Sequence, residues 1–224
     1  MTSDFTRAGQ VTLEARALLL DMDGTLVDST VVVERTWQVF ADRHALDVTA
    51  VLAFAHGRPT GETVRRFAPP GTDVLAETRR IVEHEIVDTD GVTATAGAAE
   101  LLDGLPAGCW ALVTSAGQRL AERRMRAAGL PLPAVVVSAD DVRKGKPDPE
   151  GYLAAADRLR TDPVTAVAVE DTEPGLRAAL AAGCTAVSVP PGSVRGHRRV
   201  YDVADLTRVS VVPGAGGRLA IRLR

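Results

Sequence analysis

The sequence is poor in lysine and in cysteine. Of its 26 basic residues only Lys144 and Lys146 are lysines, so the other 24 are arginines, and both lysines fall in one short segment. The two cysteines, Cys109 and Cys184, each adjoin an apolar run. This placement favours buried free thiols in a reducing compartment over a disulfide.

Three further absences exclude classes of protein. No run of about 18 consecutive apolar residues occurs, so no membrane span is expected. Residues 1 to 10 are polar and contain no apolar stretch, so they do not read as a secretory signal. The formal net charge of −3 gives no reason to expect a nucleic acid as partner. We therefore expect a cytoplasmic protein that binds neither membranes nor nucleic acid. We expect a monomer, although none of these absences decides the oligomeric state.

Strand-like apolar runs alternate with helical patterns in most of the chain. Residues 16 to 21 are typical of a strand buried on both faces. From residue 97 onward helices and strands alternate, which predicts a mostly parallel, doubly wound α/β sheet of the Rossmann-like type. Only helical patterns occur between residues 30 and 92. The predicted organisation is a polar tail at 1–14, a Rossmann-like core at 15–29 and 93–224, and an inserted small α-helical domain at 30–92.

Two carboxylates, Asp21 and Asp23, follow directly after the first apolar run. The carboxyl ends of parallel strands are where α/β proteins bind ligands, and Gly24 permits a tight turn close to a ligand. Because adjacent buried acids are costly unless a cation or a proton neutralises them, the pattern favours a metal site. A calcium-binding loop is the alternative, but Val32 stands where such a loop needs its twelfth-position Glu.

A hydroxyl and an ammonium follow later in the chain. Thr114 ends an apolar run, and its hydroxyl with the backbone N–H of Ser115 suits a phosphate oxygen. Lys146 precedes Pro147, which disfavours a helical conformation at the lysine and leaves its side chain on an extended loop. A compact point charge suits a phosphate whose geometry changes during a reaction. An exposed loop lysine is the ordinary alternative.

A second acid pair, Glu170 and Asp171, ends another apolar run, at residues 164 to 169. The alternative for Asp171 is the N-cap of the helix that follows. The order along the chain is acid pair, hydroxyl, lysine, acid pair, each at a strand end or in an adjacent loop. This joint pattern is far more specific than any of its parts.

The pattern resembles the haloacid dehalogenase superfamily of phosphatases over residues 16 to 212, beginning with Asp-Met-Asp-Gly-Thr-Leu-Val-Asp-Ser at 21–29. The helical insertion lies where that superfamily places its cap domain. Further segments resemble the 2-deoxyglucose-6-phosphate and glycerol-phosphate phosphatases, namely 30–37, 56–57, 65–67, 110–115, 145–152 and 205–207. Those enzymes have His-Gly-x-Arg-Thr in the cap loop, whereas this chain has His56-Gly57-Arg58-Pro59-Thr60, with the arginine one place early.

The resemblance implies a Mg²⁺-dependent phosphatase that acts on a small phosphorylated metabolite, such as a sugar or polyol phosphate, through an aspartyl-phosphate. It implies that Asp21 is the nucleophile and Asp23 the general acid and base. The implied phosphate contacts are Thr114, Ser115 and Lys146. The implied metal ligands are Asp21, the backbone carbonyl of Asp23, Asp171 and, through water, Glu170. The cap residues expected over the substrate are Arg58, Thr60, Glu62 and Arg65.

Two alternatives stay open. A β-phosphoglucomutase has similar core motifs but carries a cap-side His at the position of Val33. A non-catalytic binding module on the same fold is expected to have lost part of the constellation, whereas all parts are present. The residues do not distinguish deoxyglucose, glycerol, another sugar or a nucleotide as the non-phosphate half of the substrate.

Overall fold

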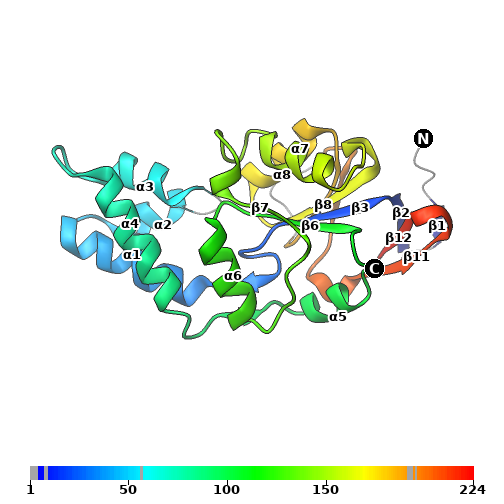
Figure 1. The fold of residues 1–224 in the computed structure, drawn as a ribbon, viewed down its shortest axis with the longest axis horizontal. Helices are drawn as coiled ribbons and strands as arrows, with labels where there is room; N and C mark the ends of the chain where they lie inside the picture. The colour runs from blue at the N-terminus through cyan, green and yellow to red at the C-terminus, as the bar shows by residue number, and fades with distance from the viewer. Residues whose placement is uncertain (1–4, 8–9, 56–57, 191–193, 195) are drawn as a thin grey trace.

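A six-stranded parallel sheet lies at the centre of the protein, with the strand order β10, β9, β8, β3, β6, β7 (Figure 1). The computed structural model describes residues 5–7, 10–55, 58–190, 194 and 196–224. The central strand is β3 (Ala17–Leu20), between β6 (Trp110–Val113) and β8 (Ala166–Glu170). The outer strands are β7 (Val135–Val137), β9 (Thr185–Ser188) and β10 (Val200–Asp202).

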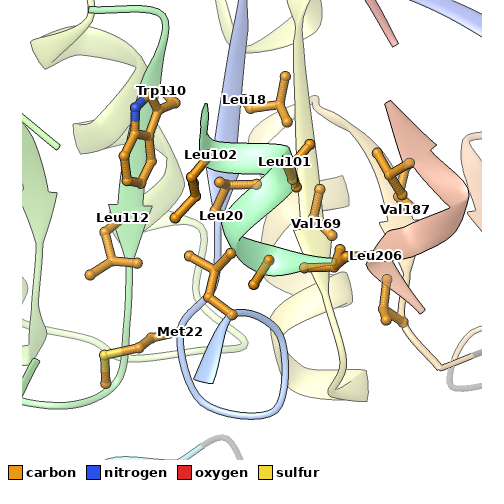
Figure 2. Close-up of a cluster of buried hydrophobic side chains, with 14 of the residues drawn as sticks. Leu18, Leu20, Met22, Leu101, Leu102, Trp110, Leu112, Val169, Val187 and Leu206 are labelled. Atoms are coloured by element: carbon orange, nitrogen blue, oxygen red, sulfur yellow. The ribbon is translucent and has the colours of Figure 1, made fainter. Parts of the chain in front are cut away.

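Helices cover both faces of this sheet because the side chains of its strands are apolar on both faces. All four residues of β3 are buried, and successive side chains along a strand point to opposite faces. Leu18 and Leu20 share a hydrophobic cluster with α5 (Ala98–Asp103) and α6 (Gln118–Ala127), part of which is shown in Figure 2.

On the opposite face, Ala17 and Leu19 share a cluster with α7 (Glu150–Arg158) and α8 (Glu173–Ala182). In Figure 1 this helix pair and the pair α5 and α6 lie on opposite sides of the sheet. The predicted doubly wound α/β fold is confirmed.

Four helices are inserted after β3, before the chain returns to the sheet. They are α1 (Thr30–His44), α2 (Val48–Ala55), α3 (Thr60–Phe67) and α4 (Val74–Val87). They pack around a core of their own, which includes Trp37, Phe40, Val51, Val64 and Ile81. This confirms the predicted helical insertion. The division into separate domains at the boundaries given above stays a prediction.

The chain leaves for the insertion and returns from it at one place. The short strand β4 (Val27–Asp28) pairs antiparallel with β5 (Thr93–Ala94). The Thr95 backbone N–H also donates to the Leu26 carbonyl, at 3.0 Å. Since β4 begins only a few residues after Asp21, the insertion joins the core directly beside the first acid pair.

The two ends of the chain form a second, antiparallel sheet that the sequence analysis did not foresee (Figure 1). Its strand order is β1 (Phe5–Arg7), β2 (Gln10–Ala15), β12 (Leu219–Leu223) and β11 (Val209–Pro213). Within the predicted polar tail at 1–14, the described residues 5–7 and 10–14 thus belong to strands. The physical reason is an alternation in β2, where Leu13 and Ala15 are buried and Glu14 is exposed.

Among the described residues, the structure contains no helix that is both long enough and apolar enough to cross a bilayer.

We predict that Leu13→Ala lowers the free energy of unfolding by about 2–4 kcal/mol, because it removes buried methyl groups from the main cluster. Thermal or urea unfolding followed by circular dichroism measures the change. Glu14→Ala is the matched control, since its side chain faces solvent and its ion pair with Arg218 is exposed. A change of less than about 0.5 kcal/mol is expected for the control. Equally small effects in both variants would contradict the placement of β2.

Candidate active site

The polar motifs predicted from the sequence meet at one edge of the central sheet. Strands β3, β6 and β8 are parallel neighbours, so their carboxyl ends lie side by side. Asp21 follows β3, Thr114 follows β6, and Glu170 is the last residue of β8. Lys146 reaches the same edge from the loop that precedes α7, because its side chain contacts Asp21 and Glu170.

Lys146 is buried between two carboxylates. Its side chain is 7% exposed, and its Nζ lies 2.5 Å from both Asp21 Oδ1 and Glu170 Oε1. Nζ also donates to the Val113 carbonyl at 3.1 Å. Burial alone would lower the pKa of Lys146, but the charges of Asp21 and Glu170 raise it above its ordinary value. The side chain is therefore held as an ammonium.

The other lysine of the chain lies outside this cluster. The Lys144 side chain is 76% exposed, and its Nζ lies 4.0 Å from Asp148 Oδ2. Since exposed pairs of this kind contribute little to stability, Lys144 has the ordinary role of a solvated loop residue.

Glu170 is fully buried and holds Lys146 in place. Its carboxylate accepts hydrogen bonds from the Tyr152 hydroxyl at 2.8 Å and from the Thr172 hydroxyl at 3.1 Å. A Cβ at position 175 would lie 1.9 Å from Glu170 Oε1, so only glycine lets helix α8 approach this carboxylate. The sequence analysis gave no role to Tyr152, whose hydroxyl completes the hydrogen bonds of a buried acid.

An acidic cluster adjoins the lysine. Asp21, Glu170 and Asp171 each place a carboxylate oxygen within 4.8 Å of the others. Burial, followed by repulsion from Glu170, raises the pKa of Asp21 to about 7. Burial, followed by repulsion from Asp21, raises the pKa of Asp171 to about 9. If all three carboxylates were ionised, the single ammonium of Lys146 would leave two negative charges uncompensated, and this repulsion contributes to both raised pKa values.

The donor set of this cluster fits a hard divalent cation. All its donors are oxygens, which Mg²⁺ and Ca²⁺ prefer, and a divalent ion would balance the excess charge. Asp171 also approaches the first motif closely, since a Cβ at position 24 would lie 2.1 Å from Asp171 Oδ2. The alternative role of Asp171 as an N-cap does not occur, because the side chain of Thr172 caps α8.

Asp23 is held by two donors. Its carboxylate accepts a hydrogen bond from the Ser29 hydroxyl at 2.7 Å through Oδ1 and lies 2.9 Å from Arg124 Nη1 through Oδ2. Arg124 Nη2 in turn donates to Glu85 Oε1 of α4 at 3.0 Å. Neither these two contacts of Asp23 nor the contact of Arg124 with Glu85 was predicted from the sequence. One signal was available, because Arg124 lies four residues after Leu120, on the apolar face of α6.

A cavity of about 230 Å³ opens above Asp21 and Asp23, between the helical insertion and the core. Arg58 and Thr60 line it from the insertion, and Thr114 and Ser115 line it from the core. The remaining insertion residues at this cavity include Val33, Glu34, Trp37 and Glu85.

A second cavity of about 280 Å³ lies beside the first and shares Thr114 and Ser115 with it. Glu62, Arg65 and Lys146 line this second cavity. The predicted cap residues are thus divided between two neighbouring cavities. His56 and Gly57, which carry part of the resemblance in the cap loop, lie outside the described residues.

Arg58 borders the first cavity and contacts an aromatic ring of α2. Its guanidinium carbon lies 4.6 Å from the centre of the Phe54 ring on α2, within the range of a cation–π contact. The residue lines both the cavity above Asp21 and an outer cavity next to Phe54 and Pro147. The early arginine of the cap loop therefore stands at the entrance to the site.

Comparisons with known proteins agree with this geometry. A sequence profile of haloacid dehalogenase-like hydrolases matches residues 15–183. The chain is 39% identical over 219 residues to hexitol phosphatase A of Escherichia coli (strain K12), with 94% of this chain and 100% of that protein covered. It is 33% identical over 235 residues to 2-deoxyglucose-6-phosphate phosphatase 1 of Saccharomyces cerevisiae, with 92% of this chain and 94% of that protein covered.

Among solved structures, the fold matches CbbY from Rhodobacter sphaeroides in complex with phosphate, with a TM-score of 0.71 at 23% identity, over 91% of this chain and 98% of that chain. At this identity the likeness shows the fold. The sequence matches confirm the predicted enzyme class, a phosphatase. The chain belongs to the haloacid dehalogenase-like hydrolase family.

Proposed function

We propose that the protein hydrolyses the phosphomonoester of a small sugar or polyol phosphate in a Mg²⁺-dependent reaction, through an aspartyl-phosphate on Asp21. The observation that carries the proposal is that Asp21 and Asp23 line a cavity between the helical insertion and the core, while Lys146 contacts Asp21 from the neighbouring cavity. A volume of about 230 Å³ suits a small molecule. The names of the two relatives, a hexitol phosphatase and a 2-deoxyglucose-6-phosphate phosphatase, support this class of substrate.

In the first step a carboxylate oxygen of Asp21 attacks phosphorus, and the bond from phosphorus to the ester oxygen breaks. Asp23 gives a proton to the departing alcohol oxygen. Lys146 holds the Asp21 carboxylate through Oδ1 and offsets the charge of the approaching phosphate. In the second step Asp23 takes a proton from water, the water oxygen attacks phosphorus, and the Asp21 carboxylate is released with inorganic phosphate.

The phosphate contacts that we propose come from the end of β6. The Thr114 hydroxyl accepts from the Ala116 backbone N–H at 3.0 Å, which fixes the side chain and leaves its own proton free to be donated. Thr114 and Ser115 border both cavities, so a phosphate placed above Asp21 lies next to them.

A Mg²⁺ ion would be held by the side chains of Asp21 and Asp171 and by the backbone carbonyl of Asp23. When bound, it supplies positive charge that offsets the nucleophile and the phosphate together. Glu170 is engaged by Lys146, Tyr152 and Thr172, so we propose that its contact with the ion runs through water.

Hydrolysis is favoured over the mutase reaction by the residue at position 33. A mutase of this fold is expected to carry a cap-side His there, whereas Val33 lines the cavity above Asp21. An alkyl side chain can neither take nor give a proton. A non-catalytic module is disfavoured because the nucleophile, the acid, the lysine and the acidic cluster all lie together.

The test is a panel of phosphate esters with the purified protein: hexitol phosphates, 2-deoxyglucose 6-phosphate, glycerol phosphate and nucleoside monophosphates. We expect release of inorganic phosphate with Mg²⁺ from sugar or polyol phosphates, loss of activity with chelator, and recovery when Mg²⁺ is restored. Ca²⁺ is expected to inhibit, since its larger and more variable shell lets both Asp21 oxygens coordinate it. No release from any ester, or full activity after metal removal, would overturn the proposal.

Arg58→Ala tests the part of the site that recognises the sugar. For the best sugar phosphate we expect kcat/KM to fall by a factor that corresponds to about 1–3 kcal/mol of transition-state binding, as for the loss of one charged hydrogen bond. Hydrolysis of p-nitrophenyl phosphate, which offers no hydroxyls, should be nearly unchanged. Arg66→Ala is the matched control, because Arg66 is exposed on α3 and stacks on Phe67 outside the cavity. Equal losses on both substrates would place Arg58 at the phosphate.

A further inference from the structure

Arg124 of α6 is a buried arginine that joins the proposed acid–base residue to the helical insertion. Its side chain is 5% exposed, and its two terminal nitrogens contact different carboxylates. Nη1 lies 2.9 Å from Asp23 Oδ2, and Nη2 lies 3.0 Å from Glu85 Oε1. All three side chains line the cavity above Asp21.

The charges of this group depend on one another. Burial alone would lower the pKa of Arg124, but the charges of Asp23 and Glu85 raise it. Burial raises the pKa of Glu85, and the charge of Arg124 opposes that shift. Without the guanidinium, the buried carboxylate of Glu85 would have no compensating charge and would be repelled by the partly exposed carboxylate of Asp23, which is unfavourable. Arg124 therefore holds both carboxylates in one arrangement.

The two oxygens of Asp23 are fixed from two sides. Ser29 donates to Oδ1 and Arg124 contacts Oδ2, so rotation of the carboxylate would break one contact or both. A general acid must present its oxygen within hydrogen-bond reach of the leaving group, and small displacements are costly in rate. A guanidinium suits this task because its planar fork is preorganised.

Arg124 is itself anchored from the insertion, because Glu85 belongs to α4. Two further arginines of α6 contact the same helix: Arg119 pairs with Glu83 at 2.9 Å, and Arg123 donates to the Ile86 carbonyl at 3.1 Å. Both side chains are on the exposed side of α6, and neither borders the cavity above Asp21. Only the buried arginine of this interface reaches the acid.

We propose that Arg124 is a positioning residue that orients Asp23 for proton transfer, with Glu85 as its anchor on the helical insertion. The inference rests on the proposed phosphatase reaction. Its consequence is that the proton-transfer steps depend on α4 being docked on α6, whereas the attack of Asp21 on phosphorus does not.

The test compares two leaving groups in Arg124→Met. For the best sugar or polyol phosphate, whose alkoxide must be protonated as it leaves, we expect the rate of the first turnover to fall at least about tenfold. This is part of the roughly 10²–10⁴-fold that general acid–base catalysis supplies. For p-nitrophenyl phosphate, whose phenolate leaves without a proton, rapid-mixing measurements should show a first turnover within about threefold of the wild type. Later turnovers should be slower, giving a burst of p-nitrophenolate, because Asp23 must still activate water.

Arg123→Met is the matched control, since it removes a contact between α6 and α4 without touching Asp23. It should leave the first-turnover rates of both substrates unchanged. Glu85→Gln keeps the side-chain volume and is the second variant if Arg124→Met does not fold. It should show the same selective loss to a smaller degree, and the two substitutions should be non-additive when combined.

Equal losses in the first-turnover rates of the two substrates would overturn the inference. Arg124 would then have only a structural role. A rise in KM with unchanged kcat would also overturn it, since the arginine would then bind substrate. The same selective loss in Arg123→Met would also overturn the inference, since the effect would then belong to the packing of α6 on α4 and not to Arg124. The wild type is measured first on both substrates, so failure of the proposed function itself is seen separately, as absence of phosphate release.

Discussion

A buried ammonium between two buried carboxylates is the interaction on which this site depends. Lys146 Nζ lies 2.5 Å from Asp21 and from Glu170, and thereby joins a loop before α7 to the ends of the two central strands β3 and β8. Burying three charges costs several kcal/mol for each ion before their attraction is counted, so such a group is weak support for stability. Its role in the proposed reaction is chemical, because Lys146 keeps the Asp21 carboxylate next to the place where the phosphate of the substrate must bind. A divalent cation would offset the repulsion among the carboxylates that Lys146 alone does not balance. Beside it, Arg124 likewise lies between two carboxylates, the buried one of Glu85 and the partly exposed one of Asp23.

The fold and the central motifs could be predicted because each leaves a local pattern. The apolar run of β3 is buried on both faces, and parallel strands bring their carboxyl ends to one edge of the sheet. Asp21 could therefore be predicted to lie near Thr114 and Glu170, although both are 93 positions or more away in the sequence. The helical insertion was equally readable, since residues 30 to 92 show only helical periodicity. Lys146 was separable from Lys144 by its place directly before a proline, and the structure buries the first and exposes the second.

The parts that the sequence did not reveal depend on pairings between distant segments. Strand β2 is short, and its only apolar face is completed by β12 at the other end of the chain, so neither strand has a strong pattern alone. Arg124 stands among several arginines on α6, where a solvated side chain is the ordinary expectation, and its partner Glu85 lies 39 positions away. Tyr152 sits on the apolar face of α7 and reads as a core aromatic, although its hydroxyl binds Glu170. For Arg124 and Tyr152 a polar side chain is satisfied by a partner that only the folded chain supplies.

The covalent bond that we propose between Asp21 and phosphorus is measured most directly by rapid acid quench of the enzyme during turnover, followed by mass spectrometry of its peptides. We expect one phosphoryl group on the peptide that contains Asp21. In Asp21→Asn we expect that group to be absent and the residual activity to be below about 1%. An unmodified Asp21 peptide throughout turnover, together with substantial activity of Asp21→Asn, would contradict the proposed covalent step and indicate direct attack by water.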